Sequence, residues 1–264
     1  MFKLGIIGIG KMGSSILDGA IKANLFSPKD VAIYTTNLEH RKKYSQEGYN
    51  ILENEASLFS NSQIILLAVK PQVYEEVLKY ANGIDFSDKC IISLAPGISI
   101  SYLERYFNNA TIVRAMPNTP AILKLSATTL CKNKDNDLSK KAIALFDQIG
   151  YQCEVEEKYI DEAIPINGSM PAYLYSFAKE FINNGVSRGL DYENAKILCA
   201  KSIIGSAQML LDSKDSIDTL INNVCSKKGT TIEGLEALYN NDFKKSIDKC
   251  YEACVNRSKE LAKK

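Results

Sequence analysis

Three glycines near the start of the chain have the spacing of a phosphate-binding loop. Gly8, Gly10 and Gly13 form the pattern G-x-G-x-x-G, directly after the strand-like segment at residues 3–7. Between a strand and a helix, the first glycine makes a tight turn and the second lets the backbone approach a pyrophosphate. The third lets the helix pack closely on the strand. The free N–H groups at the start of the helix bind the phosphates. The pattern predicts a dinucleotide site that includes Gly8, Gly10, Lys11, Met12 and Gly13.

The end of the next predicted strand indicates which dinucleotide is bound. An NAD site usually carries Asp or Glu about 20 residues after the glycines, where it holds the ribose 2′-OH. Here the chain reads Ile-Tyr-Thr-Thr-Asn, without a carboxylate. Thr35, Thr36 and Asn37 can donate hydrogen bonds to a phosphate, and Arg41 and Lys42 follow closely. This favours NADPH, with NADH still possible. The alternative is that Arg41 and Lys42 belong only to a solvated helix face.

The elements that must position these residues alternate between strand and helix. Apolar runs without polar alternation are typical of strands that are buried on both faces of a parallel sheet. Strand-like segments of this kind, rich in Ile, Leu and Val, lie at residues 3–8, 31–35, 63–69, 90–94 and 111–115, and helical patterns lie between several of them. This order predicts an α/β fold with a doubly wound sheet of the Rossmann type over residues 1–158.

From about residue 160 the strand patterns end and only helical patterns follow, at residues 172–183, 192–212, 216–224 and 232–263. We therefore expect an all-α domain over residues 159–264. Its long helices carry more apolar surface than a unit of this size can bury alone, so we expect a second subunit to cover part of it.

Composition excludes several classes of protein. The chain of 264 residues has one His, which excludes a multi-His metal site, and its seven Cys are irregularly spaced without a C-x-x-C pattern. That spacing is not a zinc signature. With 32 Lys and Arg against 31 Asp and Glu, the chain has no broad field for nucleic acid. We therefore expect no bound metal and no nucleic-acid partner.

The apolar runs also bear on location. The longest one, at residues 64–69, has six residues and is too short to cross a bilayer. The strand pattern begins almost at the first residue and leaves no room for a signal peptide. We expect a cytoplasmic protein that does not enter a membrane.

Four further segments, together with the glycine loop, resemble the pyrroline-5-carboxylate reductase family. They read Ala-Val-Lys-Pro-Gln at 68–72, Arg-Ala-Met-Pro-Asn-Thr-Pro at 114–120, Gly-Ser-Met-Pro-Ala-Tyr at 168–173 and Val-Cys-Ser-Lys-Lys-Gly-Thr-Thr-Ile at 224–232. The resemblance covers nearly the whole chain. It implies a Rossmann domain followed by a helical dimerisation domain, in a homodimer or a higher homo-oligomer. It also implies hydride transfer from NAD(P)H to the imine carbon of 1-pyrroline-5-carboxylate, which gives L-proline.

The resemblance also assigns roles to single residues. Beside the cofactor it places Asn54, Ala68, Val69, Lys70 and Pro71. Around the nicotinamide it places Met116 and Asn118, with Thr119 and Pro120. For the substrate it implies Ser226, Gly229, Thr230 and Thr231. Backbone N–H groups near the last three would bind the carboxylate, and the Thr231 hydroxyl would hydrogen-bond the ring nitrogen as the catalytic contact. A protonated imine is already electrophilic, so binding in the right geometry and exclusion of water are enough.

The substrate segment also has a purely structural interpretation. Thr230 and Glu233 fit the pattern S/T-x-x-E, which predicts a capping box at the start of a helix. The two interpretations are compatible, because a helix start has several free donors.

The chain departs from the family pattern at three positions. Met170 stands where the family has a second glycine of Gly-Ser-Gly-Pro-Ala, and Lys227 and Lys228 stand where it has Pro-Gly. The lysines could strengthen binding of the carboxylate or could point to solvent. A non-catalytic or regulatory paralogue of the competence type is therefore an alternative function. A less favoured alternative is a 3-hydroxy-acid dehydrogenase that uses Lys179 and Asn183, one helical turn apart.

Overall fold

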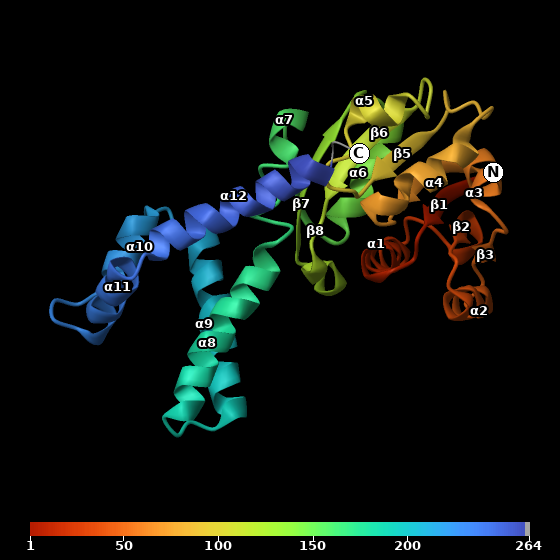
Figure 1. Ribbon diagram of the computed structural model, residues 1–264. Helices are drawn as coiled ribbons and strands as arrows, with labels where there is room; N and C mark the ends of the chain where they lie inside the picture. Colours follow the sequence, from red (N-terminus) through yellow and green to blue (C-terminus); the bar gives the residue numbers. More distant parts are fainter. Residues whose placement is uncertain (262–264) are drawn as a thin grey trace. The chain divides into compact units, whose positions relative to one another are not determined.

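An eight-stranded sheet dominates the first part of the chain (Figure 1). The computed structural model describes residues 1–261, and the strands lie in the order β3-β2-β1-β4-β5-β6-β7-β8. Every neighbouring pair is parallel except β6 and β7. The strands are β1 (Phe2–Ile7), β2 (Val31–Tyr34), β3 (Asn50–Ile51), β4 (Ser62–Leu67), β5 (Cys90–Ser93), β6 (Thr111–Met116), β7 (Ser126–Lys132) and β8 (Gly150–Glu154). The expected doubly wound sheet is confirmed.

Helices cover both faces of this sheet because its strands are apolar on both faces. Along β1, Ile6 and Ile7 belong to two different hydrophobic clusters, and Leu66 and Leu67 of β4 divide in the same way. The helices of this part are α1 (Lys11–Lys22), α2 (Leu38–Gln46), α3 (Glu55–Asn61), α4 (Tyr74–Leu78), α5 (Ile100–Glu104), α6 (Asp137–Asp147) and α7 (Glu157–Ile160). The first cluster includes side chains of α3, α4 and α5, and the second includes side chains of α1, α2 and α6.

A buried arginine ties the segment after the last strand to the sheet. Arg114 of β6 is only 2% exposed, and its guanidinium contacts Glu157 Oε1 at 2.9 Å and Asp161 Oδ1 at 3.3 Å. Asp161 Oδ1 also accepts a hydrogen bond from Ser258 Oγ at 3.0 Å. Asp161 therefore links strand β6, through Arg114, to the distant segment that contains Ser258.

These contacts explain where the chain divides. Among the described residues, one compact unit comprises 1–171 and 254–261, and the other is Ala172–Ala253. The sequence prediction changed domain at residue 159, where the strand patterns end. In the structure, residues 159–171 group with the sheet because Asp161 and Asn167 are bonded to it.

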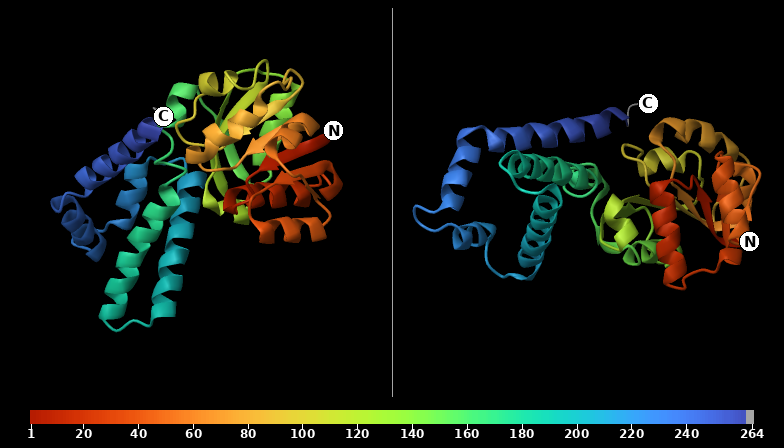
Figure 2. Two further views of the ribbon diagram at one scale, coloured as in Figure 1. Left: turned by 45° about the vertical axis from the view of Figure 1, so that its right-hand side comes forward. Right: turned by 90° about the horizontal axis from the view of Figure 1, so that it is seen from below.

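The second unit is built from helices and has little core of its own. Helices α8 (Met170–Ser187) and α9 (Tyr192–Asp212) form a hairpin (Figure 2), followed by α10 (Ile217–Val224), α11 (Thr230–Asn240) and α12 (Phe243–Leu261). Among residues 172–253, Ala195 is the one buried residue. The large apolar side chains that are exposed include Phe181, Leu198, Ile204, Met209, Leu211 and Ile217. So much exposed apolar area is typical of a subunit interface. No helix within residues 1–261 is long and apolar enough to cross a membrane.

Replacing Arg114 with Met tests how much the sheet unit depends on the buried ion pairs. The variant leaves Glu157 and Asp161 without their cation, so we expect the free energy of unfolding to fall by about 3 kcal/mol. Urea denaturation measures this change. The control is Lys259→Met, which breaks the exposed pair of Lys259 with Glu162 and should cost less than about 1 kcal/mol. Equal losses in the two variants would contradict the central role of Arg114.

Candidate dinucleotide and substrate site

The three glycines of the first loop have different physical reasons to be glycine. Gly8 has φ +91°, and a Cβ there would lie 2.7 Å from Val69 Cγ1 and 2.9 Å from Ala68 O. A Cβ on Gly13 would collide with Gly8 O and would lie 3.2 Å from Ala68 Cβ. A Cβ on Gly10 would meet no atom of the described residues within 4 Å, apart from its two chain neighbours. Packing thus requires Gly8 and Gly13, whereas the space beside Gly10 is open to a ligand.

The helix that follows the loop presents donors toward this space. Gly10 is the N-cap of α1, no side chain caps this end, and its first turn carries no acidic residue. The first backbone N–H groups of a helix have no partner within the helix and carry a partial positive charge. The open position and the uncapped helix end together fit the pyrophosphate of a dinucleotide.

The loop after β4 forms the adjacent wall. Ala68 N donates to Ile7 O at 2.9 Å, which places Ala68 and Val69 directly beside the glycine turn. Lys70 is exposed, and Pro71 begins the short 3₁₀ segment Pro71–Val73. The structure therefore brings the predicted Ala68, Val69 and glycine residues together at the neighbouring ends of β1 and β4. In this strand order, β1 and β4 flank the switch point at which dinucleotides bind.

The residues predicted to bind the 2′-phosphate lie in different environments at the corner after β2. Thr35 is 7% exposed and its Oγ1 accepts from Asn37 N at 3.3 Å, whereas Thr36 is exposed. Asn37 Oδ1 accepts from His40 N and so caps α2. Arg41 Nη2 donates to Leu52 O at 3.2 Å, which holds its guanidinium near this corner. Lys42 lies exposed on α2.

The start of α3 lies beside the same corner. Asn54 is the N-cap of α3, and its Oδ1 accepts from Ser57 N at 2.8 Å. The next residue, Glu55, is buried. Burial, together with the Glu55 carboxylate, raises the pKa of Tyr34, so the phenol stays neutral at physiological pH. No sequence pattern predicts this buried carboxylate, because Glu55 has the position of an ordinary first-turn residue of a helix.

The end of β6 is held by two buried asparagines. Asn118 Nδ2 donates to Asn167 O at 3.0 Å, and its Oδ1 accepts from Ala127 N at 3.1 Å. Asn167 Nδ2 donates to Met116 O at 2.7 Å. The Asn118 amide thus positions the backbone around the buried Met116. Sequence reasoning missed Asn167, although it directly precedes the segment that begins at Gly168.

The substrate segment starts a helix, but not in the predicted way. The N-cap of α11 is Gly229, with φ −83° and ψ 165°, and no side chain caps this end. The predicted capping box of Thr230 and Glu233 is therefore wrong. Because the extended cap conformation falls on Gly229, Thr230 is already the first helical residue, and Glu233 is one position too far along for a box. The uncapped end leaves donors for an anion.

The turn before α11 brings Gly229 close to Ser226 and strains Lys228. Gly229 N donates to Ser226 O at 3.0 Å, and a Cβ on Gly229 would collide with Ser226 Oγ. Lys228 has φ +59°, in the left-handed region where glycine costs least. Thr230 and Thr231 border a hollow of about 710 Å³ whose apolar wall includes Phe181.

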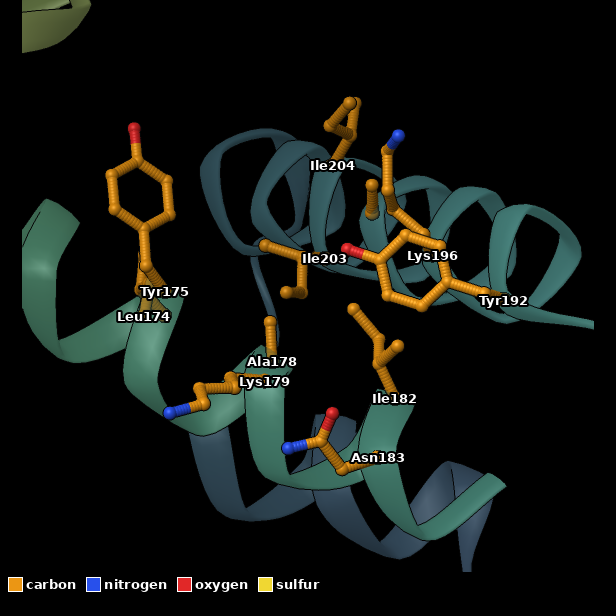
Figure 3. A pocket seen from close by; sticks show the side chains of 11 residues that line it. Leu174, Tyr175, Ala178, Lys179, Ile182, Asn183, Tyr192, Lys196, Ile203 and Ile204 are labelled. Atoms are coloured by element: carbon orange, nitrogen blue, oxygen red, sulfur yellow. The ribbon is translucent and has the colours of Figure 1, made fainter. Parts of the chain in front are cut away.

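The residues of the dehydrogenase alternative line a different hollow. Lys179 and Asn183 lie on α8 beside an apolar groove of about 540 Å³ between α8 and α9 (Figure 3). Its walls include Ile182, Tyr192 and Ile203. The predicted one-turn spacing holds, but the surroundings are those of an apolar helix interface.

The strand order, the glycine loop and the uncapped start of α1 define a dinucleotide-dependent oxidoreductase. A family model described as pyrroline-5-carboxylate reductase dimerisation matches residues 157–261, and one described as NADP oxidoreductase, coenzyme F420-dependent, matches residues 3–97. The pyrroline-5-carboxylate reductase of Methanosarcina acetivorans is 31% identical over 99% of this chain and 98% of its own length. The chain belongs to the pyrroline-5-carboxylate reductase family.

Solved structures agree with this membership. The chain is similar to the Plasmodium falciparum pyrroline carboxylate reductase with NADP bound, with a TM-score of 0.88 and 32% identity over 99% of this chain and 98% of that one. It is also similar to 1-pyrroline-5-carboxylate reductase from Streptococcus pyogenes, with a TM-score of 0.88 and 30% identity over 98% of each chain.

Substituting the glycines one at a time tests which of them serves the ligand. Gly10→Ala meets no atom of the described residues apart from its chain neighbours, so we expect its thermal midpoint to change little while its affinity for NADPH falls about tenfold or more, a cost of about 1.4 kcal/mol. Gly13→Ala collides with Gly8 O and should lower the midpoint itself. Calorimetry and NADPH titration measure both. Full NADPH affinity in Gly10→Ala would contradict the assignment.

Proposed function

We propose that this chain catalyses the reduction of 1-pyrroline-5-carboxylate to L-proline, the last step of proline biosynthesis, with NADPH preferred over NADH. The observation that carries the proposal is the open space at Gly10 beside an uncapped helix, in a chain that matches this reductase family over its whole length. Mixing the purified protein with NADPH and pyrroline-5-carboxylate and following NADPH absorbance tests it.

The reaction needs little chemistry from the protein. Bound NADPH supplies the hydride. The start of α1 binds the pyrophosphate, and the wall formed by Ala68 and Val69 positions the cofactor beside the glycine turn. At α11, N–H groups near Gly229 and Thr230 bind the substrate carboxylate, with Ser226 assisting. The Thr231 hydroxyl accepts a hydrogen bond from the protonated ring nitrogen and orients the imine carbon. Each of these contacts lowers the entropic cost of bringing the reacting atoms together.

The chain forms a homo-oligomer through its helical part. The dimerisation model matches residues 157–261, and the second unit has almost no buried side chain of its own. We propose a homodimer as the basic assembly, because a second copy offers the same apolar helix faces.

The alternative function, a regulatory paralogue, rests on the turn before α11, which departs from the family pattern. Lys227 and Lys228 are both exposed, and Lys228 has a left-handed backbone conformation. The segment that would bind the substrate therefore differs in charge and geometry from the family pattern. A paralogue of that kind would bind NADPH without turning over pyrroline-5-carboxylate. Measurable turnover in the assay above would exclude it.

Placing a carboxylate after β2 tests the preference for NADPH. Thr36 is exposed, so Thr36→Glu should fold normally, and its charge should repel the 2′-phosphate. We expect KM for NADPH to rise about tenfold or more, with a smaller change for NADH, since tenfold is about 1.4 kcal/mol. The buried Thr35 is a poorer test, because Glu there would also disturb the fold. The matched control is Lys43→Glu on the exposed face of α2; a shift as large as that of Thr36→Glu would indicate only a general charge effect.

Removing one hydroxyl tests the catalytic contact. Thr231→Ala should lower kcat/KM for pyrroline-5-carboxylate by about 1–3 kcal/mol, the scale of one lost hydrogen bond. Steady-state kinetics with saturating NADPH measure it. Thr219→Ala, on the exposed face of α10, makes the same change in the same unit and should leave kcat/KM unaltered. An unchanged kcat/KM in Thr231→Ala would remove Thr231 from the site.

A further inference from the structure

The loop between β4 and α4 is closed at its base by a buried tyrosine. Tyr74, the first residue of α4, is 1% exposed. Its hydroxyl donates to Leu67 O at 3.1 Å and lies 2.9 Å from Ser93 Oγ. Leu67 and Ser93 are the last paired residues of the neighbouring strands β4 and β5. The Tyr74 hydroxyl therefore joins the ends of both strands, and Tyr74 is itself the residue at which the loop enters α4.

These contacts form a directed chain of hydrogen bonds. The single proton of the Tyr74 hydroxyl goes to Leu67 O, so Ser93 Oγ–H donates to the tyrosine oxygen. Ser93 Oγ in turn accepts from Ala95 N at 3.4 Å. Burial raises the pKa of Tyr74 far above neutrality, so the phenol remains a donor throughout the physiological range. Each polar atom in the chain has a partner in a region without solvent, where an unpaired one would be costly.

The rest of the loop between β4 and α4 is only weakly held by its surroundings. Lys70 and Gln72 are exposed, and the 3₁₀ segment is held by a bond from Val73 N to Lys70 O at 3.1 Å. Beside Pro71 lies a hollow of about 100 Å³, so packing on that side is loose. On the other side, Val69 Cγ1 and Ala68 O approach the Cβ position of Gly8 within 3 Å. A small shift of the loop would therefore change the wall of the dinucleotide site.

We propose that Tyr74 is a positioning residue for the cofactor: by joining Leu67 to Ser93 it holds the wall formed by Ala68 and Val69 against the glycine turn. This inference rests on the proposed function, in which that wall lines the NADPH site. Tyr74 does not touch the cofactor itself. Its effect should appear in NADPH binding and not in the chemistry at the substrate.

Tyr74→Phe in the full chain tests the proposal with little change in shape. Loss of the hydroxyl leaves Leu67 O with the single bond from Leu94 N and breaks the link to Ser93. We expect Kd and KM for NADPH to rise about three- to tenfold, the effect of one hydrogen bond. KM for pyrroline-5-carboxylate and kcat at saturating NADPH should stay within about twofold. Ser93→Ala, which removes the next link, should shift Kd in the same direction.

One control separates positioning from loss of stability. Phe86→Leu weakens the same hydrophobic cluster at a position that packs on Phe59 and Phe107. Phe86→Leu should lower the thermal midpoint and leave Kd for NADPH unchanged. The proposal is overturned if Tyr74→Phe and Ser93→Ala keep wild-type affinity for NADPH, or if Phe86→Leu weakens binding as much as they do.

Direct titration with NADPH keeps this test separate from that of the function. If the wild-type protein binds NADPH but does not reduce pyrroline-5-carboxylate, the proposed function fails and the Tyr74 variants are still judged by Kd. If the wild-type protein does not bind NADPH, both proposals are overturned.

Discussion

The sheet unit depends on one buried cation. Arg114 lies in the middle of β6, where water is excluded, and removing a guanidinium from water carries a large desolvation cost. That cost is offset by Glu157 and Asp161, which also accept hydrogen bonds from Ile100 N, Gly97 N and Ser258 Oγ. The cluster thereby connects β6 with the loop after β5, with α7 and with the end of α12.

Such a cluster contributes more to arrangement than to net stability. Arg114 Nε is buried without a hydrogen-bond partner among the described residues, so the cation is incompletely satisfied. An apolar set of similar shape could be as stable, but it would not require these three segments to meet at one point. The arrangement places the end of β6, with Met116 and Asn118, next to the Asn167 segment.

At the edge of the sheet where the cofactor would bind, some residues serve the packing of the fold and others leave room for the ligand. Gly8 and Gly13 serve the contact between the first loop and the Ala68–Val69 wall, while Gly10 leaves space. Tyr74 and Ser93 fix the base of that wall from inside the sheet. The dinucleotide would therefore be contacted mostly by backbone atoms, and buried side chains determine where that backbone lies.

The sequence by itself determined the parts that depend on local pattern. Apolar strand runs, helical periodicity and glycine spacing predicted the doubly wound sheet, the helical second part and the first loop, because each signal comes from residues close together in the chain. The tertiary structure alone decided the contacts across long separations. Asn118 meets Asn167 and Arg114 meets Asp161 because strands and loops far apart in sequence fold side by side. It also decided the start of α11, where the extended backbone at Gly229 makes this residue the N-cap, one position before the Thr-x-x-Glu pattern. Side-chain partners of this kind follow from the folded backbone, which local pattern does not specify.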